Sequence, residues 1–288
     1  MELKMNKKSQ KKSAKTNHTV LTISLTLTML FLGLMNVNAQ EAEKATDTYK
    51  AFDAGLRVKN MHLWHGFVVH PGAMIATNLD FYSRDKKFNF GVWGGASFSG
   101  TDVTNQTTGE TVSSHYKEFS IYTSYKFSDK FFIEAVSHNN YTGVEERGDD
   151  LHYWSYDITQ GYNFVDVNFG YNITPNTLLY LATIIGGGSG DYEVKDDGST
   201  ENSWTHYFEV KSKVWERENT SLSVFAGGAW SFLTDKTFYT NNSGNLINVG
   251  ATLSKQINVG NFKLPVDVTA MWNPEQEKTV LQVDLVIF

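Results

Sequence analysis

The sequence predicts an all-β protein, a transmembrane antiparallel β-barrel of twelve strands. Three observations predict it: an N-terminal secretory leader, segments of about ten residues in which apolar and polar residues alternate, and connections that alternate between short and long. Alternation with a period of two gives each strand one apolar and one polar face. The chain is 14% aromatic, with 23 Gly and only 4 Pro among 288 residues, which suits strands and tight turns.

Residues 1–39 have the organisation of a cleaved signal peptide. Six lysines between positions 4 and 15 precede an uncharged apolar run over 20–34, and the segment ends on Ala39, a small residue suited to cleavage. The run is shorter than the roughly 20 residues that span a bilayer, which argues against an uncleaved anchor. We expect a periplasmic lead-in over 40–53, which is charged and aperiodic, and the barrel over 54–288.

The charge balance excludes some functions. Removal of the leader takes six of the 25 basic and one of the 31 acidic residues, which leaves 19 against 30 and a net charge of −11. Such a chain lacks the basic face that phosphate binding requires, so we expect no nucleic-acid partner. The chain has no cysteine, which excludes disulfides and thiolate metal sites, and we expect no cofactor.

Twelve segments are predicted as strands. They cover 55–69, 73–83, 88–100, 116–127, 131–141, 163–172, 177–186, 203–215, 220–233, 246–257, 262–273 and 279–288. In 163–172, for example, Val165, Val167 and Phe169 share one face, and Asp166 and Asn168 share the other. Alternation alone would also suit a soluble sandwich, in which the apolar faces look inward.

The connections favour a barrel. Five short links, at 84–87, 128–130, 174–176, 216–219 and 258–261, alternate with longer ones at 101–115, 142–162, 187–202 and 234–245; 70–72 and 274–278 are short exceptions. Outer-membrane barrels have short periplasmic turns and longer outer loops. With a periplasmic N-terminus, every long loop falls outside. Aromatics near the strand ends, such as Phe127 and Trp272, fit two interfacial girdles.

Three segments carry a resemblance to a known family. Residues 63–67 (Leu-Trp-His-Gly-Phe), 90–94 (Phe-Gly-Val-Trp-Gly) and 118–127 are similar to the turn into the second strand, the third strand and the fourth strand of TorF-type outer-membrane porins. The resemblance covers the first half of the mature chain, and His65 stands where many relatives have Arg. It implies a pore in the outer membrane of a Gram-negative bacterium, with relatives across the Bacteroidetes.

The charged residues of the predicted strands form the strongest candidate site. By alternation these residues point away from lipid, where a charge near the midplane costs about 2–4 kcal/mol. They are Glu118, Lys126, Glu134, His138, Asp166, Glu209, Lys211, Lys213, Asp267 and Asp284. Two interpretations follow, a charged eyelet that selects solutes or a network of ion pairs that fills the interior. Twelve strands lie between barrels filled by side chains and barrels with an open channel.

Other candidate sites are weaker. In one continuous strand, His62 and His70 are too far apart to share a metal. His138 with a loop serine would imitate the base and nucleophile of a lipid-modifying enzyme, but no motif supports the pair. The acidic run after 186–190 fails the spacing of a calcium loop, so we expect a solvated loop. We therefore predict no catalytic, cofactor or metal site.

The last residue departs from the pattern. Leu281, Val283 and Leu285 form the apolar face of the last strand, whereas Phe288 is in phase with Gln282 and Asp284. Either a bulge re-aims the end of the strand or Phe288 packs inward at the rim.

The predicted function is that of a monomeric channel for passive diffusion of small hydrophilic solutes. We expect it to contact outer-membrane lipid and the barrel assembly machinery. A non-conducting barrel that binds a surface partner, and a secreted soluble β-protein, are the alternatives.

Overall fold

The computed structural model describes residues 49–104, 109, 111–146, 148, 152, 154–241 and 244–288. The predicted leader, and the lead-in up to residue 48, lie outside the described residues. Everything reported below belongs to the compact unit Lys50–Phe288.

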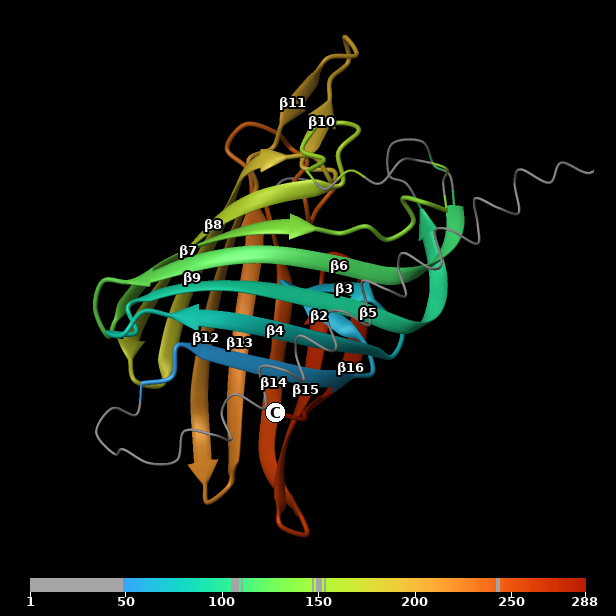
Figure 1. Cartoon of the computed structure of the whole chain (residues 1–288). Helices are drawn as coiled ribbons and strands as arrows, with labels where there is room; N and C mark the ends of the chain where they lie inside the picture. Colours follow the sequence, from blue (N-terminus) through green and yellow to red (C-terminus); the bar gives the residue numbers. More distant parts are fainter. Residues whose placement is uncertain are drawn as a thin grey trace, which may run out of the picture. The chain divides into compact units, whose positions relative to one another are not determined.

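Twelve of the sixteen strands in the described residues close into one antiparallel barrel (Figure 1). They are β1 (Phe52–Lys59), β4 (Met74–Tyr82), β5 (Phe88–Thr104), β6 (Thr111–Lys126), β7 (Phe131–Asn139), β8 (Asn163–Thr174), β9 (Thr177–Gly187), β12 (His206–Arg217), β13 (Thr220–Trp230), β14 (Asn245–Val259), β15 (Phe262–Asn273) and β16 (Lys278–Val286). Each pairs with its neighbours in this order, and β1 pairs with β16. The predicted fold class is confirmed. No helix in the described ranges is long and apolar enough to cross a membrane.

The apolar faces of the strands point outward. On β8, Asn168 is 1% exposed, whereas its neighbour Phe169 is 36% exposed. The same alternation leaves large apolar side chains exposed all around the barrel: Phe81, Phe90, Tyr125, Phe169, Tyr171, Ile185, Phe208, Val224, Leu253, Ile257, Trp272 and Leu281. A soluble protein buries such a surface, and a barrel in lipid exposes it. The sandwich alternative is therefore wrong.

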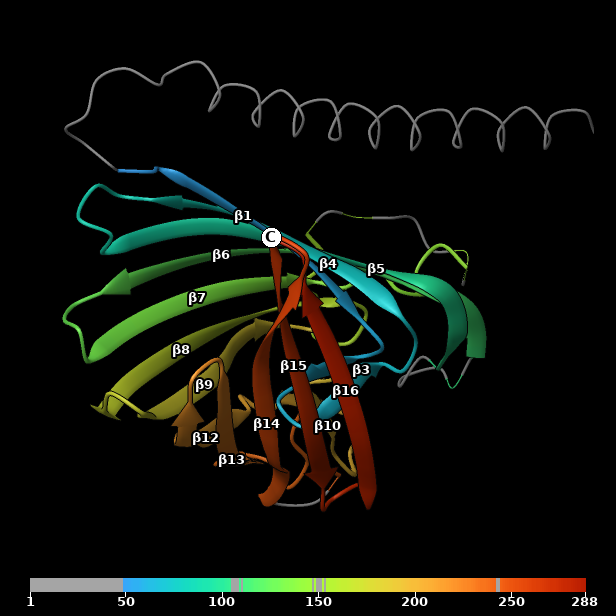
Figure 2. The same cartoon turned by 90° about the horizontal axis from the view of Figure 1, so that it is seen from below.

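The two ends of the barrel differ, as Figures 1 and 2 show. Tight turns join β4 to β5, β6 to β7, β8 to β9, β12 to β13 and β14 to β15, and both Phe52 and Phe288 lie at the same end, which we call the turn end. The opposite end, the loop end, carries the longer connections, including the small hairpin of β10 (Tyr192–Val194) and β11 (Thr200–Asn202).

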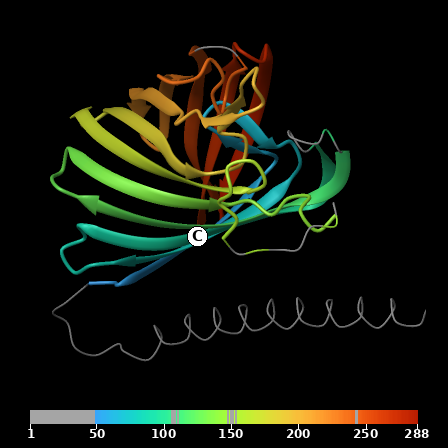
Figure 3. The ribbon, with the colours of Figure 1, turned by 90° about the horizontal axis from the view of Figure 1, so that it is seen from above.

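The first predicted strand, 55–69, is wrong. The barrel strand β1 ends at Lys59, and the chain then forms a separate hairpin of β2 (His62–Trp64) and β3 (Phe67–His70). His65 and Gly66 make the turn, with φ angles of 46° and 85°. We call residues 60–73 the lumen hairpin, because it lies inside the ring of barrel strands (Figure 3). Its side chains are apolar and aromatic because protein surrounds them, so its alternation resembles that of a wall strand.

The seam between β1 and β16 is the shortest regular pairing of the barrel. The described residues align in three pairs there, Arg57 with Val286, Val58 with Leu285 and Lys59 with Asp284, whereas β1 and β4 align in eight. Beyond Lys59 the side chain of Asn60 continues the seam, since its Nδ2 donates to Leu281 O and its Oδ1 accepts from Val283 N.

A β-bulge ends the seam at the turn end. Ile287 N donates to Leu56 O at 2.8 Å, and Leu56 N donates to Phe288 O at 3.0 Å. Two residues of the last strand therefore face one residue of β1, which is the defining pattern of a bulge. Leu56 shares the outward face of β1 with Phe52, so the bulge turns Phe288 outward as well, where it is 47% exposed. Of the two explanations for the phase of Phe288, the bulge is the correct one.

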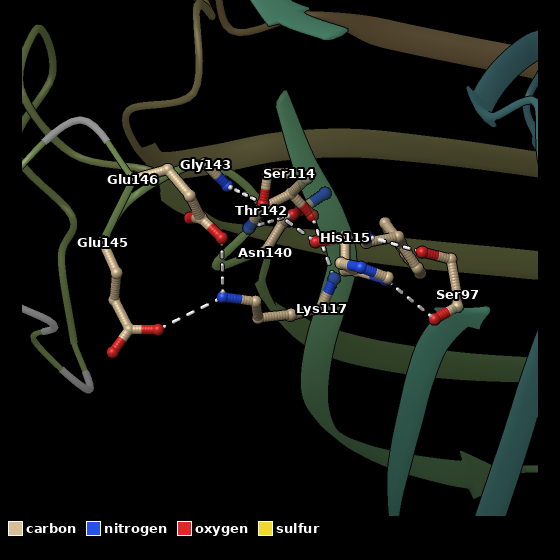
Figure 4. Close-up of polar contacts among 10 residues, drawn as sticks. Ser97, Ser114, His115, Lys117, Asn140, Thr142, Gly143, Glu145 and Glu146 are labelled. Atoms are coloured by element: carbon tan, nitrogen blue, oxygen red, sulfur yellow. Dashed lines mark hydrogen bonds and ion pairs between the residues drawn. The ribbon is translucent and has the colours of Figure 1, made fainter. Parts of the chain in front are cut away.

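The loop after β7 covers an edge of β6. β7 pairs with β6 only from Ile121 to Lys126, which leaves the loop-end half of β6 without a strand neighbour on that side. Residues 140–146 occupy this edge (Figure 4): Lys117 N donates to Thr142 Oγ1, and Gly143 N donates to the buried Ser114 Oγ, both at 3.0 Å. Lys117 Nζ lies 3.1 Å from carboxylate oxygens of Glu145 and Glu146. Without this cover the edge would offer open backbone groups for pairing.

Candidate functional site: the lumen and its hairpin

The lumen hairpin crosses the barrel and docks on the opposite wall. At its tip, the His65 ring stacks on Tyr207 of β12 with centroids 4.0 Å apart, and His65 Nδ1 lies 2.8 Å from the hydroxyl of Tyr239. Asn273 Nδ2 of β15 donates to Gly66 O at 3.1 Å. A Cβ at Gly66 would lie 2.2 Å from the carbonyl oxygen of Ile247, so only glycine fits here.

Aromatic packing surrounds the hairpin at both of its ends. Around the tip, a buried cluster of Ala182, Tyr207, Ala229, Tyr239 and Ile247 contacts Trp64, Phe67, Tyr180 and Phe238. Near the base, Val69 packs on Met74, Ala76 and Tyr116, and His62 stacks on Trp93. The hairpin is therefore a fixed part of the interior, and the lumen is narrowed where it crosses.

A cavity of about 800 Å³ remains beside the hairpin. Its lining includes Lys236, Asn241 and Gln276 from the loop end, and Arg57, Asn78 and Glu134 from deeper in the wall. The cavity therefore extends from the outer loops past the hairpin. Closer to the turn end, the inward-facing Lys126 and Lys211 are exposed to solvent.

His138 lies between two carboxylates on the wall of this cavity. Its Nε2 is 3.2 Å from Asp166 Oδ2, and its Nδ1 is 3.8 Å from Glu118 Oε1. Glu118 also accepts hydrogen bonds from the hydroxyls of Tyr116 and Ser120. An imidazole with an acceptor at each nitrogen is best matched when both nitrogens carry a proton, so this group forms a charged triad.

The triad does not fit a serine–histidine pair. In such a pair one ring nitrogen faces the nucleophile and the other is oriented by a carboxylate, whereas both nitrogens of His138 face carboxylates. The nearby hydroxyls are also engaged, Ser120 with Glu118 and Ser137 with Tyr156. The best candidate residue of the enzyme hypothesis is thus in the wrong surroundings.

A second ionic cluster lies at the seam. Arg57 Nη1 donates to Asp284 Oδ2 at 2.8 Å and lies 4.0 Å from Asp267, and Lys59 Nζ lies 3.4 Å from Asp284. Arg57 and Lys59 are not among the predicted lumen residues. Their alternation with the apolar Leu56 and Val58 is the signal that marks them as inward-facing.

The predicted lumen residues separate into groups. Glu118, Glu134 and His138 line the cavity, and Asp166 lies behind them, where Asn168 Nδ2 bridges it to Glu134. Asp267 belongs to the seam cluster. Glu209 accepts from Tyr207 Oη at 2.6 Å and Asn248 Nδ2 at 2.8 Å, close to the docked tip. Lys126, Lys211 and Lys213 lie toward the turn end, and Lys213 pairs with Glu216.

His62 and His70 are not far apart, contrary to the prediction from one continuous strand. They are paired across the lumen hairpin, because the segment folds back instead of running straight. No group of three or more His, Cys, Asp or Glu side chains suited to a metal ion occurs in the part of the chain that the structure describes.

The acidic run after Gly190 does not converge on a common point. Asp191 is 1% exposed and accepts from Thr205 N and Oγ1, whereas Asp197 caps its own turn through Ser199. Burial raises the pKa of the Asp191 carboxyl to about 6.

The comparisons with known proteins give only distant structural likenesses. No family model and no curated protein matches the chain. A Pseudomonas aeruginosa FadL homologue aligns over 82% of this chain and 73% of its own, with 12% identity and a TM-score of 0.38. LpxR from Salmonella typhimurium aligns over 82% and 99%, with 9% identity and a TM-score of 0.35. The Ralstonia pickettii toluene transporter TbuX aligns over 82% and 87%, with 11% identity and a TM-score of 0.38. At these values no function carries over from one protein to another.

Proposed function

We propose that the protein is an outer-membrane channel of a Gram-negative bacterium, through which small hydrophilic solutes diffuse passively past the lumen hairpin. The observation that carries the proposal is the cavity beside the hairpin, because its lining includes residues of the outer loops and residues deep in the wall. Solvent-exposed Lys126 and Lys211 continue the polar interior toward the turn end.

The outward surface supports the location. A closed sheet with an apolar exterior and a polar interior satisfies every condition for a strand protein in lipid. The turn end would face the periplasm and the loop end the medium, as in barrels with short turns inside and long loops outside. The TorF-type resemblance and the monomeric state stay predictions.

A non-conducting barrel is the second candidate. The observation that favours it is the docked tip of the hairpin, where Gly66, His65 and the surrounding aromatic cluster leave no space on that side of the lumen. In this case the outer loops would bind a partner, and the interior would serve only stability.

Planar-bilayer recording separates the two candidates. The wild-type protein is refolded and compared with a variant in which residues 61–72 are replaced by a short Gly-Ser linker. The proposal predicts small conductance steps in the wild type and steps several-fold larger in the variant, since the constriction is gone. A variant that shortens 195–199 in the β10–β11 hairpin serves as control and should keep the wild-type steps. No wild-type conductance, with large steps in the linker variant, would favour the non-conducting barrel.

A further inference from the structure

The charges on the cavity wall do not cancel on the side of β6, β7 and β8. At the seam, two bases face two acids, since Arg57 and Lys59 lie against Asp267 and Asp284. On the side of β6, β7 and β8, one imidazolium accompanies three carboxylates: Glu118 and Asp166 contact His138, and Glu134 is linked to Asp166 through Asn168 Nδ2. A carboxylate in a protein interior without a cation is costly, so this wall favours a positive ligand.

Of these three carboxylates, Glu134 is the one that lacks a partner of opposite charge within the described residues. Glu118 and Asp166 share His138, whereas Glu134 has no ion pair within the described residues and accepts one hydrogen bond, from Asn168 Nδ2 at 3.3 Å. Asn168 is 1% exposed, and its Oδ1 has no hydrogen-bond partner in the same part of the chain. The Glu134 carboxylate on the cavity wall therefore has one hydrogen bond and no counter-ion among the described residues.

Tyr122 lines the same cavity as Glu134. Its ring lies over Gly91, where a Cβ would come within 2.3 Å of the ring, and its hydroxyl donates to Asp80 at 2.7 Å. Tyr122 pairs with Val136 across β6 and β7, which makes Glu134 its diagonal neighbour on the inward face. The Cα atoms of diagonal neighbours are about 7–8 Å apart, and the Tyr122 ring reaches from its own position across β5 toward Asp80. A cation in the cavity within about 6 Å of the ring centroid is attracted to the ring face.

We propose that the lumen cavity binds a small organic ammonium ion, with the Glu134 carboxylate as its counter-ion and the Tyr122 ring as part of its aromatic wall. The volume of about 800 Å³ is that of a small-molecule site and far exceeds the need of a bare metal ion. Trp64, Trp93 and Phe164 add aromatic lining, which suits alkylated ammonium groups. The claim that organic ammonium ions are the substrates of the channel rests on the proposed function. The claim that the cavity binds them does not.

The test measures choline binding to the detergent-refolded protein by calorimetry, with 3,3-dimethyl-1-butanol, the uncharged analogue of choline, as a second probe. We expect choline to bind and the alcohol to bind at least tenfold more weakly. Glu134→Gln and Tyr122→Leu should each weaken choline binding at least tenfold, whereas Tyr122→Phe, which keeps the ring, should retain it. Glu218→Gln, at an exposed turn, is the matched charge control. Heat-modifiable migration on a gel establishes folding of each variant.

The reversal potential of the wild type under a KCl gradient gives a readout that needs no variant, and it should favour K⁺ over Cl⁻. Choline binding without conductance would refute the proposed channel function and support the ammonium site. Conductance without choline binding would refute the ammonium site and support the channel function. Conductance together with choline binding by Glu134→Gln as tight as that of the wild type would do the same.

Discussion

His65, at the tip of the hairpin that crosses the lumen, is stacked ring on ring with Tyr207 of β12, with centroids 4.0 Å apart and planes only 13° apart. The pair joins a turn of the lumen hairpin to the far wall of the barrel. Trp64 stacks on the other side of His65 at 4.3 Å, so the imidazole lies between two aromatic rings. A segment held in this way is a structural constriction, and its removal should be measurable.

Gly66→Ala should release the tip of the hairpin. The added Cβ would clash with the carbonyl oxygen of Ile247, and the φ of 85° strains any residue but glycine. We expect a loss of about 1–3 kcal/mol, a weaker near-ultraviolet circular dichroism signal from the stacked rings and larger conductance steps. Gly186→Ala is the control, because a Cβ there meets nothing within 4 Å. Unchanged dichroism and conductance in Gly66→Ala would contradict the docked hairpin.

His138→Gln should destabilise the barrel strongly. It leaves Glu118 and Asp166, which are 10% and 3% exposed in their side chains, without their shared cation. Breaking a buried ion pair on one side costs about 3–5 kcal/mol. Urea unfolding in micelles should show this loss, and adding Glu118→Gln and Asp166→Asn to the same chain should recover most of it. If the triple variant is no more stable than His138→Gln alone, the charged triad is wrong.

The loop end should become more stable on mild acidification because of Asp191. Burial raises its pKa from the ordinary value of 3.8 to about 6, so between these values the folded state holds a proton that the unfolded state has lost. Stability therefore falls as pH rises through this window, and going from pH 7 to 5 should add about 1 kcal/mol. Limited proteolysis of the 188–205 loop at the two pH values measures the effect. Asp191→Asn should abolish the difference.

The attachment of residues 140–146 to the edge of β6 should depend more on the Ser114 hydroxyl than on the ion pairs of Lys117. Ser114→Ala leaves the buried N–H of Gly143 without an acceptor, which costs about 1–3 kcal/mol. Lys117→Gln breaks partly exposed contacts with Glu145 and Glu146 and should cost less than about 1 kcal/mol. Hydrogen exchange along 112–118 compares the two. The reverse order of effects would mean that the ion pairs hold the loop.

The walls of the barrel could be predicted from the sequence, and its interior could not. Period-two alternation identified the twelve strands and the outward faces, because lipid imposes that period on every wall strand. The lumen hairpin could not be predicted because its residues contact protein on all sides. Only the His65–Gly66 turn distinguishes residues 62–70 from a wall strand. The orientation of Phe288 could not be predicted for another reason. A one-residue bulge moves the residues that follow it to the opposite face from the one that period-two alternation predicts.

In the candidate site, too, the facing of the side chains could be predicted from the sequence and their contacts could not. Alternation places Glu118, Glu134, His138 and Asp166 on the inward face, but which carboxylates contact the His138 imidazole depends on the cross-strand register. Register is set by turns and bulges along the whole sheet, and no pattern within a single strand reveals it.

The seam also gives the barrel an order in which it comes apart. Local opening begins where few backbone bonds must break together, and the join of the first and last strands is regular over only three residue pairs. Past Lys59 the seam continues only through Asn60, by one backbone bond from its N to Val283 O and by its side-chain amide, at the point where the chain leaves the wall to enter the lumen. If β1 and β16 separate from Asn60 onward, the start of the lumen hairpin loses its attachment to the wall before any other strand pair separates. Opening of the barrel wall and detachment of the lumen hairpin would then occur in the same step.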